Sequence, residues 1–275
     1  MNSFLQSYLN ELKVFFSNPE LELRILLKNS SIKKKDIILS NFEVKDIDTI
    51  KFNNAFQRRI KREPISKIFN YKNFWKYNFY VNCDVLDPRP ETELIVEKIL
   101  EFYPKKDQSL KILDMCTGSG CLAITLAKEY SKAKVIGTDI SSKALEIAKF
   151  NAHKLNCINQ IDFLECNLLE NFEIFDIVVS NPPYLSEFEY DNTSSEIQLF
   201  EPKISLIAAN EGLEFYQKIA NILPNILNKN SRAFFEIGSK QAKETIAIFR
   251  SKNLKCLKIV NDMQNLNRVL ILKKC

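Results

Sequence analysis

The sequence predicts an α/β protein in which helices cover both faces of a largely parallel sheet, with a small helical domain in front of it. Three observations support this fold class. Strand-like and helix-like runs alternate from residue 110 onward. A glycine-containing turn at 117–120 joins the first strand of this series to its first helix. Residues 1–72 instead have the apolar spacing of helices.

The N-terminal residues indicate a bundle of short helices. Phe4, Tyr8 and Leu12 fall at helical spacing. Asn18-Pro19 then offers a cap and a first-turn proline for a second helix. Residues 47–63 indicate another helix with a basic end, and no catalytic cluster is visible in this part of the chain.

Aromatic and polar residues alternate between residues 69 and 81, with an interruption at Lys72-Asn73. This alternation is typical of strands, and the interruption suggests a turn. We therefore expect a short hairpin, assigned to a linker at 73–84, between the helical domain at 1–72 and a larger domain at 85–275.

The larger domain has the strand and helix order of a doubly wound sheet. Its last two strands are separated by too few residues for a helical crossover, so we expect them to pair antiparallel. The expected strands are residues 110–115, 134–139, 161–165, 173–180, 232–238, 254–260 and 267–274, and the expected helices are 118–130, 141–154, 212–227 and 239–252.

Composition excludes several classes of protein. No apolar run reaches the roughly 18 residues that cross a bilayer, and charges interrupt the apolar N-terminus, so we expect neither a membrane span nor a signal peptide. Seven cysteines without C-x-x-C spacing indicate reduced thiols in a cytoplasmic protein, with no metal site. The one histidine, His153, is expected on a helix surface, which leaves little material for a histidine-dependent triad. The net charge of +5 is mild, and the basic runs at 31–35 and 57–63 fit solvated helix faces or a polyanionic partner.

The turn after the first strand has the features of a nucleotide-type site. Gly118 to Ala123 satisfy G-x-G-x-x-A, and Asp139 ends the next strand, where an acid holds ribose hydroxyls. This half fits a dinucleotide or S-adenosylmethionine, or a tight turn without a ligand. Asp114 precedes the turn, where it would face an ammonium group and repel a pyrophosphate. Together with the antiparallel last strands, this favours S-adenosylmethionine.

A second chemical signal, Asn181-Pro182-Pro183-Tyr184, follows the fourth strand. That strand is expected beside the first, so the motif should lie next to the glycine turn. Prolines fix φ and lack N–H donors, which leaves the Asn181 amide oxygen and the Pro182 carbonyl as rigid acceptors. Two acceptors can hold a planar NH₂ group, and Tyr184 can stack on it. An amide nitrogen is a weak nucleophile, so holding it at attack distance is the main assistance, without a metal or covalent intermediate.

At this point the sequence resembles the protein-(glutamine-N5) methyltransferases that modify peptide chain release factors, the PrmC/HemK family. The resemblance covers nearly the whole chain. The PRPETE and FEP segments are more specific than NPPY, which DNA and RNA amino-methyltransferases share. The matching segments are residues 63–75, 87–97, 113–127, 137–152, 177–185, 200–219, 234–241 and 267–272.

The resemblance implies a Rossmann-like, seven-stranded class I S-adenosylmethionine-dependent methyltransferase whose N-terminal helical domain docks the substrate. That substrate would be the glutamine of the Gly-Gly-Gln loop of class 1 release factors, with no membrane partner and no direct need for nucleic acid. The implied donor site comprises Cys116, Thr117, Gly118, Ser119, Gly120, Asp139, Asn167, Leu168 and Asn181. Asn181, Pro182, Pro183 and Tyr184 would hold the glutamine, with Asn181, Pro182 and Tyr184 catalytic.

Three residues depart from the family pattern. Cys116 stands where glycine is usual, and a positive φ there would cost roughly 1 kcal/mol of strain. Asp87 replaces an apolar residue, and Asn167 replaces an acid near the adenine. The proton acceptor is open: Glu201 and the acids of 187–196 are candidates, or else solvated or capping charges.

Three alternative functions are weighed against this one. A ribosomal-protein glutamine methyltransferase would share the motif but differ in its N-terminal region. An adenine-N6 or guanine-N2 methyltransferase acting on nucleic acid needs a base-recognition domain or a large basic surface, which the mild charge does not supply. A non-catalytic S-adenosylmethionine-binding protein would not need the intact NPPY motif.

Overall fold

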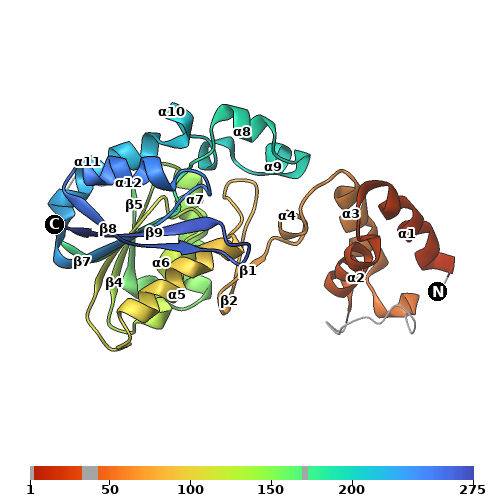
Figure 1. Cartoon of the computed structure of the whole chain (residues 1–275). Coiled ribbons are helices and arrows are strands. Elements are labelled where there is room, and N and C mark those ends of the chain that lie inside the picture. Colours follow the sequence, from red (N-terminus) through yellow and green to blue (C-terminus); the bar gives the residue numbers. More distant parts are fainter. Residues whose placement is uncertain (1–2, 33–42, 169–172) are drawn as a thin grey trace. The chain divides into compact units, whose positions relative to one another are not determined.

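The computed structural model describes residues 3–32, 43–168 and 173–275 (Figure 1). Its contacts divide into two compact units. The helical unit holds the described residues up to Asn70 together with Ser194–Phe200. The sheet unit holds Tyr71–Thr193 and Glu201–Cys275, without residues 169–172.

The helical unit is built on three helices, α1 (Ser3–Phe15), α2 (Pro19–Ser30) and α3 (Thr49–Ile60). The predicted cap is confirmed, because the Asn18 side chain accepts a hydrogen bond from the Leu21 N–H and Pro19 opens α2. The core of the unit is apolar and fully packed, with Leu5, Leu9, Leu12, Leu23, Leu26, Leu27, Phe52 and Phe56 buried. Shorter elements of this unit are η2 (Val44–Asp46), α4 (Ile65–Phe69) and α9 (Ser195–Phe200).

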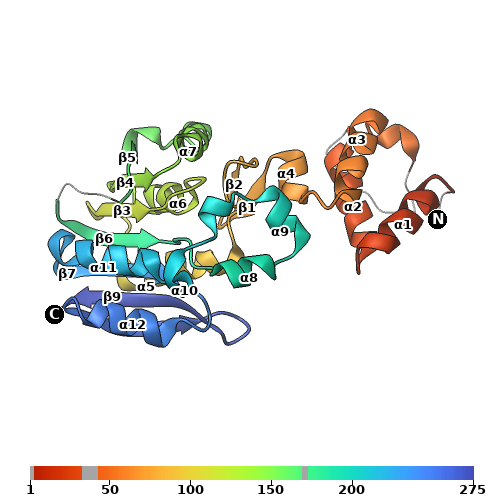
Figure 2. The same ribbon diagram turned by 90° about the horizontal axis from the view of Figure 1, so that it is seen from above.

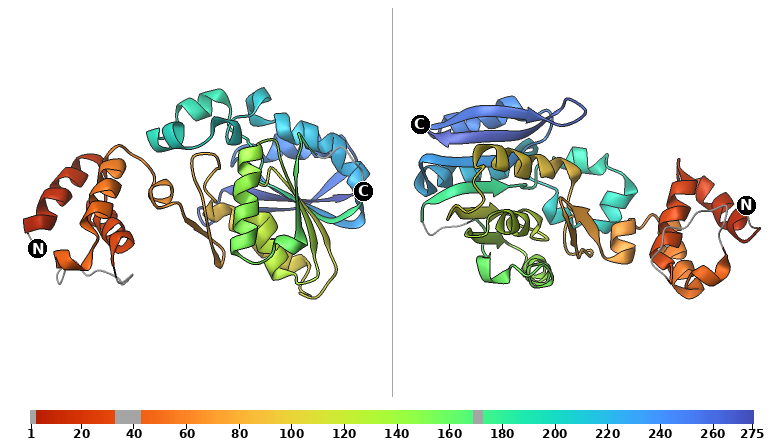
Figure 3. Two further views of the ribbon diagram at one scale, coloured as in Figure 1. Left: turned by 180° about the vertical axis from the view of Figure 1, so that it is seen from behind. Right: turned by 90° about the horizontal axis from the view of Figure 1, so that it is seen from below.

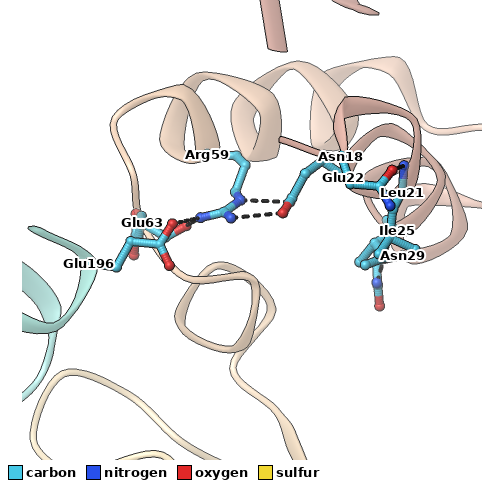
Figure 4. A network of polar contacts seen from close by, with 8 residues as sticks. All are labelled: Asn18, Leu21, Glu22, Ile25, Asn29, Arg59, Glu63 and Glu196. Atoms are coloured by element: carbon cyan, nitrogen blue, oxygen red, sulfur yellow. Dashed lines mark hydrogen bonds and ion pairs between the residues drawn. The ribbon is translucent and has the colours of Figure 1, made fainter. Parts of the chain in front are cut away.

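A buried arginine connects several elements of the helical unit (Figure 4). Arg59 is only 5% exposed, and it donates to both carboxylate oxygens of Glu22 at 2.8 and 2.9 Å and to Glu196 at 2.9 Å. Its guanidinium carbon also lies 4.0 Å from the centre of the Phe16 ring. The basic run at 57–63 is therefore partly an internal contact, which neither sequence interpretation foresaw. Residues 33–35 of the other basic run lie outside the described residues.

The predicted hairpin is present, but its turn is elsewhere. Strands β1 (Lys72–Phe74) and β2 (Tyr77–Phe79) pair antiparallel, so the turn is at Trp75-Lys76 rather than at Lys72-Asn73. Trp75 has a φ of 56°, and its backbone N–H donates to Glu93 at 2.8 Å. The Glu93 carboxylate, which lies outside the hairpin, thus stabilises a turn that the residues of the hairpin alone do not predict.

The sheet unit contains a seven-stranded sheet in the order β5-β4-β3-β6-β7-β9-β8. Figures 2 and 3 show the C-terminal strands, in blue, at one side of the sheet. Strands β3 to β7 run parallel, and β9 pairs antiparallel with both β7 and β8, as predicted. The strand bounds are β3 (Lys111–Met115), β4 (Lys134–Asp139), β5 (Ile161–Glu165), β6 (Phe175–Ser180), β7 (Leu227–Glu236), β8 (Leu254–Asn261) and β9 (Asn267–Lys274).

Helices cover both faces of this sheet, and alternate strand residues pack on opposite faces. Ile112 and Val179 pack with helices α5 and α6, whereas Leu113 and Val178 pack with α11 and α12. Both faces are apolar because every central strand is buried on two sides. The helix bounds are α5 (Glu93–Phe102), α6 (Cys121–Glu129), α7 (Ser142–Lys154), α11 (Glu214–Ile226) and α12 (Ala242–Arg250).

The chain between β6 and α11 forms short elements that the sequence patterns did not predict. One of them packs against the NPPY motif at Gly212 (φ 80°). A Cβ at this position would lie 2.1 Å from the Tyr184 carbonyl oxygen, so only glycine allows this close approach. Gln241 also donates to that carbonyl at 2.9 Å. Within the described ranges no helix is long and apolar enough to cross a membrane. The remaining short elements are η3 (Pro90–Thr92), η4 (Ile158–Gln160), α8 (Glu187–Asp191), η5 (Lys203–Ser205) and α10 (Ala209–Gly212).

Candidate active site

A cavity of about 190 Å³ lies at the carboxyl ends of β3, β4, β5 and β6. This is the edge at which open α/β sheets bind ligands. The sequence-predicted residues that line the cavity are Cys116, Gly118, Asp139, Asn167, Leu168, Asn181 and Pro183. Further lining comes from Asp84–Leu86, Pro202, Ile204, Ser205, Phe215 and Lys218, which the sequence analysis did not assign to a site.

The glycine turn after β3 has the left-handed backbone that its residues predict. The φ angles of Cys116, Gly118 and Gly120 are 59°, 54° and 81°. The expected strain at Cys116 is therefore present, at about 1 kcal/mol. A Cβ built on Gly118 would meet nothing within 4 Å, so the turn leaves open space above it. A Cβ on Gly120 would instead come within 2.9 Å of the Ile124 side chain, so glycine lets α6 begin there.

Asp139 locks the end of β4 to this turn. Its carboxylate accepts from the Gly118 N–H at 2.9 Å and from the Ser141 N–H at 3.0 Å, and the residue lines the cavity. Burial raises the pKa of Asp139, while the N–H groups of Ser141, Gly118 and Ile140 oppose that shift by stabilising the anion. A partly desolvated carboxylate that faces a cavity is suited to accept hydrogen bonds from hydroxyl groups.

Asp114 lies beneath the turn and does not line the cavity. It is 1% exposed and accepts from the Thr117 hydroxyl at 2.6 Å and from the Ala123 N–H at 3.0 Å. Burial raises its pKa to about 7. One oxygen of Asp114 thus holds the turn and the first residues of α6, while its other oxygen has no hydrogen-bond partner among the described residues. The direct contact with a ligand's ammonium group stays a prediction.

The NPPY motif lies beside the glycine turn, as the strand order predicts. Strand β6 pairs with β3, and the Ser180 hydroxyl donates to the Met115 carbonyl at 2.6 Å, which ties the two strand ends together. Asn181 and Pro183 line the cavity. Pro182 is buried, and Tyr184 is half-buried and packs against the core beside α11 and α12.

The side chains of the motif are held by two residues that the sequence analysis did not assign. The Asn181 amide nitrogen donates to the Thr92 hydroxyl at 3.1 Å, and that hydroxyl donates to Glu236. The Tyr184 hydroxyl donates to the other oxygen of Glu236 at 3.1 Å. Burial raises the pKa of Glu236, opposed by the Thr92 hydroxyl, the charge of Arg268 and the Tyr184 hydroxyl. Burial also raises the pKa of Tyr184.

Comparisons with known proteins place this site in a family. Residues 90–200 match the model of the methyltransferase small domain. A bifunctional methyltransferase of Rickettsia bellii is 33% identical over 98% of this chain and 55% of its own length. A release factor glutamine methyltransferase of Flavobacterium psychrophilum is 33% identical over 98% of both chains. The chain belongs to the release factor glutamine methyltransferase family.

The fold agrees with this family. A methyltransferase structure from Pyrococcus furiosus superposes with a TM-score of 0.54 at 15% identity, over 81% of this chain and 98% of its own. The strand order and the antiparallel β9 are those of an S-adenosylmethionine-dependent methyltransferase, so the family and fold imply use of that cofactor. The chain spans about half the length of the Rickettsia relatives, which are named bifunctional.

Several family residues support the site without lining it. Thr117 and Ser119 are buried under the turn, and Gly120 begins α6. Asn151, fully buried on α7, donates to the carbonyls of Ser119 and Tyr80 at 2.9 and 3.0 Å. This amide therefore holds the turn to the chain that follows the hairpin.

Glu201 is a buried acid that connects two segments of the chain. It is 7% exposed, pairs with Arg89 at 3.1 Å and accepts from the Asp87 N–H at 3.2 Å. It thus joins the FEP and PRPET segments and does not line the cavity. Asp87 is itself buried, at 3% exposed, so a polar residue is accommodated at this departure from the family pattern.

A sequence signal for Glu236 is its place at the end of an apolar strand. Asp139 and Glu236 each end an apolar strand with an acid at the same edge of the sheet. Thr92 was less visible, because its role depends on α5 packing beside β7. His153 is exposed on α7 as predicted, and the seven cysteines are free thiols.

Proposed function

We propose that the chain transfers a methyl group from S-adenosylmethionine to the side-chain amide nitrogen of the glutamine in the Gly-Gly-Gln loop of class 1 release factors. The observation that carries this proposal is that Asn181 of the NPPY motif lines the same cavity as Gly118 and Asp139. A clamp for an NH₂ group and a donor site then share one space. The family supports the choice of substrate, since the relative from Flavobacterium psychrophilum, which this chain matches over 98% of its length, is named a release factor glutamine methyltransferase.

The donor side of the cavity fits the cofactor. The space above Gly118 is open, and the Asp139 carboxylate beside it would accept hydrogen bonds from the ribose hydroxyls. Asn167 and Leu168 would lie near the base. When bound, the cofactor supplies an electrophilic methyl carbon on a sulfonium. The remaining contribution comes from how the chain orients the nucleophile.

The acceptor side orients an amide. The lone pair of an amide nitrogen is delocalised, so the effective assistance is to hold the NH₂ group at attack distance. The Asn181 side-chain oxygen and the Pro182 carbonyl would accept its two N–H donors. These acceptors strengthen their hold as positive charge develops on nitrogen. Pro182 and Pro183 keep the acceptors rigid, and Tyr184, fixed by Glu236, closes the clamp.

We propose further that the helical unit docks the release factor and that the protein acts in the cytoplasm, where such a substrate is found. The helical unit leaves apolar side chains on its surface, including Val14 at 75% and Ile50 at 74% exposure. A protein partner could bury such side chains, whereas a nucleic acid is bound mainly through charge.

A labelled-methyl transfer assay tests the proposed function. Equal amounts of a class 1 release factor, a ribosomal protein substrate and nucleic acid are incubated separately with the protein and labelled cofactor. Label is expected on the release factor alone, and it should vanish when the glutamine of its Gly-Gly-Gln loop is replaced by alanine. Label on nucleic acid or on the ribosomal protein alone would refute the proposal.

A further inference from the structure

A continuous chain of hydrogen bonds runs behind the NPPY clamp. It begins at the Asn181 amide nitrogen, passes through the Thr92 hydroxyl and ends on Glu236, which also receives the Tyr184 hydroxyl. Thr92 and Glu236 are 2% and 1% exposed, so water does not compete for these groups. Three distant parts of the sequence thus meet: the PRPET segment, the NPPY motif and the end of β7.

The direction of this chain of bonds is fixed by its last member. In its ionised form, which the nearby charge of Arg268 favours, the Glu236 carboxylate only accepts hydrogen bonds, so the hydroxyls of Thr92 and Tyr184 both donate to it. A hydroxyl has one hydrogen, and the Thr92 oxygen can then only accept from its other neighbour. Only the nitrogen of the Asn181 amide can donate. The amide oxygen is therefore the group that Asn181 presents on its opposite side.

We infer that Glu236 is a positioning residue, which through Thr92 fixes the Asn181 amide so that its oxygen is presented to an N–H donor of the substrate. This inference rests on the proposed function and adds a specificity element to it. A clamp fixed in this direction favours a primary amide, and it repels a glutamate side chain, whose carboxylate has no N–H to donate. Glu236 is 1% exposed and does not line the cavity, so in this structure it reaches the clamp only through Thr92 and Tyr184.

The geometry also explains why the residue is an acid and why it is placed on this strand. Phe234 packs on the α5 side of the sheet and Phe235 on the other side, so the alternation directs Glu236 toward α5. Thr92 precedes α5 directly and meets it there. A glutamine at position 236 would have the same shape, but its amide nitrogen could donate to Thr92. That reversal would let the Asn181 amide turn over.

The test compares three variants with the wild type in the release-factor assay: Glu236→Gln, Thr92→Val and Thr92→Ser. Glu236→Gln and Thr92→Val should lower kcat by about 10²-fold, as expected for a misoriented reacting group. Thr92→Ser keeps the hydroxyl and should stay within about threefold of the wild type. Cofactor affinity, measured by calorimetry, should change by less than about threefold in all three. A kcat near the wild-type value in Glu236→Gln, or an equal loss in Thr92→Ser and Thr92→Val, would overturn the inference.

A second readout does not depend on activity. In a ¹H–¹⁵N spectrum of the full chain, the Asn181 side-chain NH₂ signal is assigned by its loss in Asn181→Asp. Its hydrogen exchange should be slow in the wild type and in Thr92→Ser, and roughly 10-fold faster in Thr92→Val and Glu236→Gln. Equal exchange in all four proteins would overturn the inference. Absence of release-factor labelling by a wild type with a protected NH₂ would instead refute the proposed substrate and leave the positioning role standing.

Discussion

The helical unit and the sheet unit each bury a charged side chain, and they satisfy it in different ways. Arg59 meets two carboxylates and an aromatic ring, so its charge is balanced within the fold. Among the described residues, Glu236 accepts from hydroxyls and makes no ion pair. A balanced charge mainly affects stability, because its loss leaves partners unpaired. The Glu236 carboxylate has only hydroxyl donors in contact and the more distant charge of Arg268, and such a group is tolerated where it orients other groups, here Asn181 and Tyr184.

Among the variants that separate an effect on turnover from an effect on stability, Asn181→Ala should have the largest effect. It removes one positioned acceptor, so turnover should fall by about 10²-fold or more, while cofactor affinity and stability are largely kept. Steady-state kinetics and calorimetry measure the two quantities. An equal loss of cofactor binding and turnover would show that Asn181 serves the donor instead of the clamp.

Asp139→Ala should lower cofactor affinity, whereas Asn181→Ala should lower turnover. Loss of the carboxylate removes the expected ribose contacts and frees the Gly118 N–H, so cofactor affinity should fall by about 10- to 10²-fold. Asp139→Asn is the matched control, because it keeps one acceptor and should lose less. Calorimetric titration measures the cofactor affinity of both variants. An unchanged affinity in Asp139→Ala would show that Asp139 does not bind the cofactor.

Arg59→Met tests the stability half of the comparison. Its partners Glu22 and Glu196 have side chains 18% and 31% exposed, so water can replace part of the lost contact. We expect the free energy of unfolding to fall by about 2 kcal/mol, below the full cost of a deeply buried pair. Arg58→Met is the control, because its side chain is 45% exposed and should matter by less than about 1 kcal/mol. Urea unfolding of the full chain measures the free energy of unfolding of both variants. Equal losses would contradict the conclusion that Arg59 stabilises the helical unit more than Arg58 does.

A third acid, Glu129, adds a pH dependence. Burial raises its pKa, but the hydrogen bonds from Lys106, Lys76 and Trp75 outweigh this and lower the pKa to about 2. A lowered pKa contributes stability above the ordinary value of 4.5, which is lost as the pH falls from there toward 2. Glu129→Gln should therefore flatten the decline of Tm over that interval. An unchanged slope would mean that other carboxylates dominate acid unfolding.

The smallest effect is expected from Cys116→Gly. Glycine relieves the strain at φ 59°, but it also increases the entropy of the unfolded chain, and the two terms nearly cancel. The free energy of unfolding should change by less than about 1 kcal/mol, and cofactor affinity should be equal or slightly higher. A large loss of affinity would show that the Cys116 side chain itself contacts the donor.

Sequence patterns predicted what depends on local residues. The pairing of β6 with β3, the antiparallel last two strands and the cap at Asn18 agree with the sequence patterns, and the positive φ of Cys116 occurs where the family usually has glycine. What they missed depends on contacts between distant segments. The turn at Trp75 is held by Glu93, and Thr92 meets Glu236 across 144 positions of sequence. Arg59 seemed to belong to a basic surface because its partners lie on other elements.

The most direct test of the account is to map the methyl group on a release factor after reaction with the wild-type protein. Peptide mass spectrometry of the product identifies both the residue and the atom class that is modified. We expect a single methyl group on the side-chain nitrogen of the glutamine in the Gly-Gly-Gln loop, and about 10²-fold less of this product after reaction with Asn181→Ala over the same time. A methyl group on any other residue, or equal modification by Asn181→Ala, would contradict the proposed amide clamp.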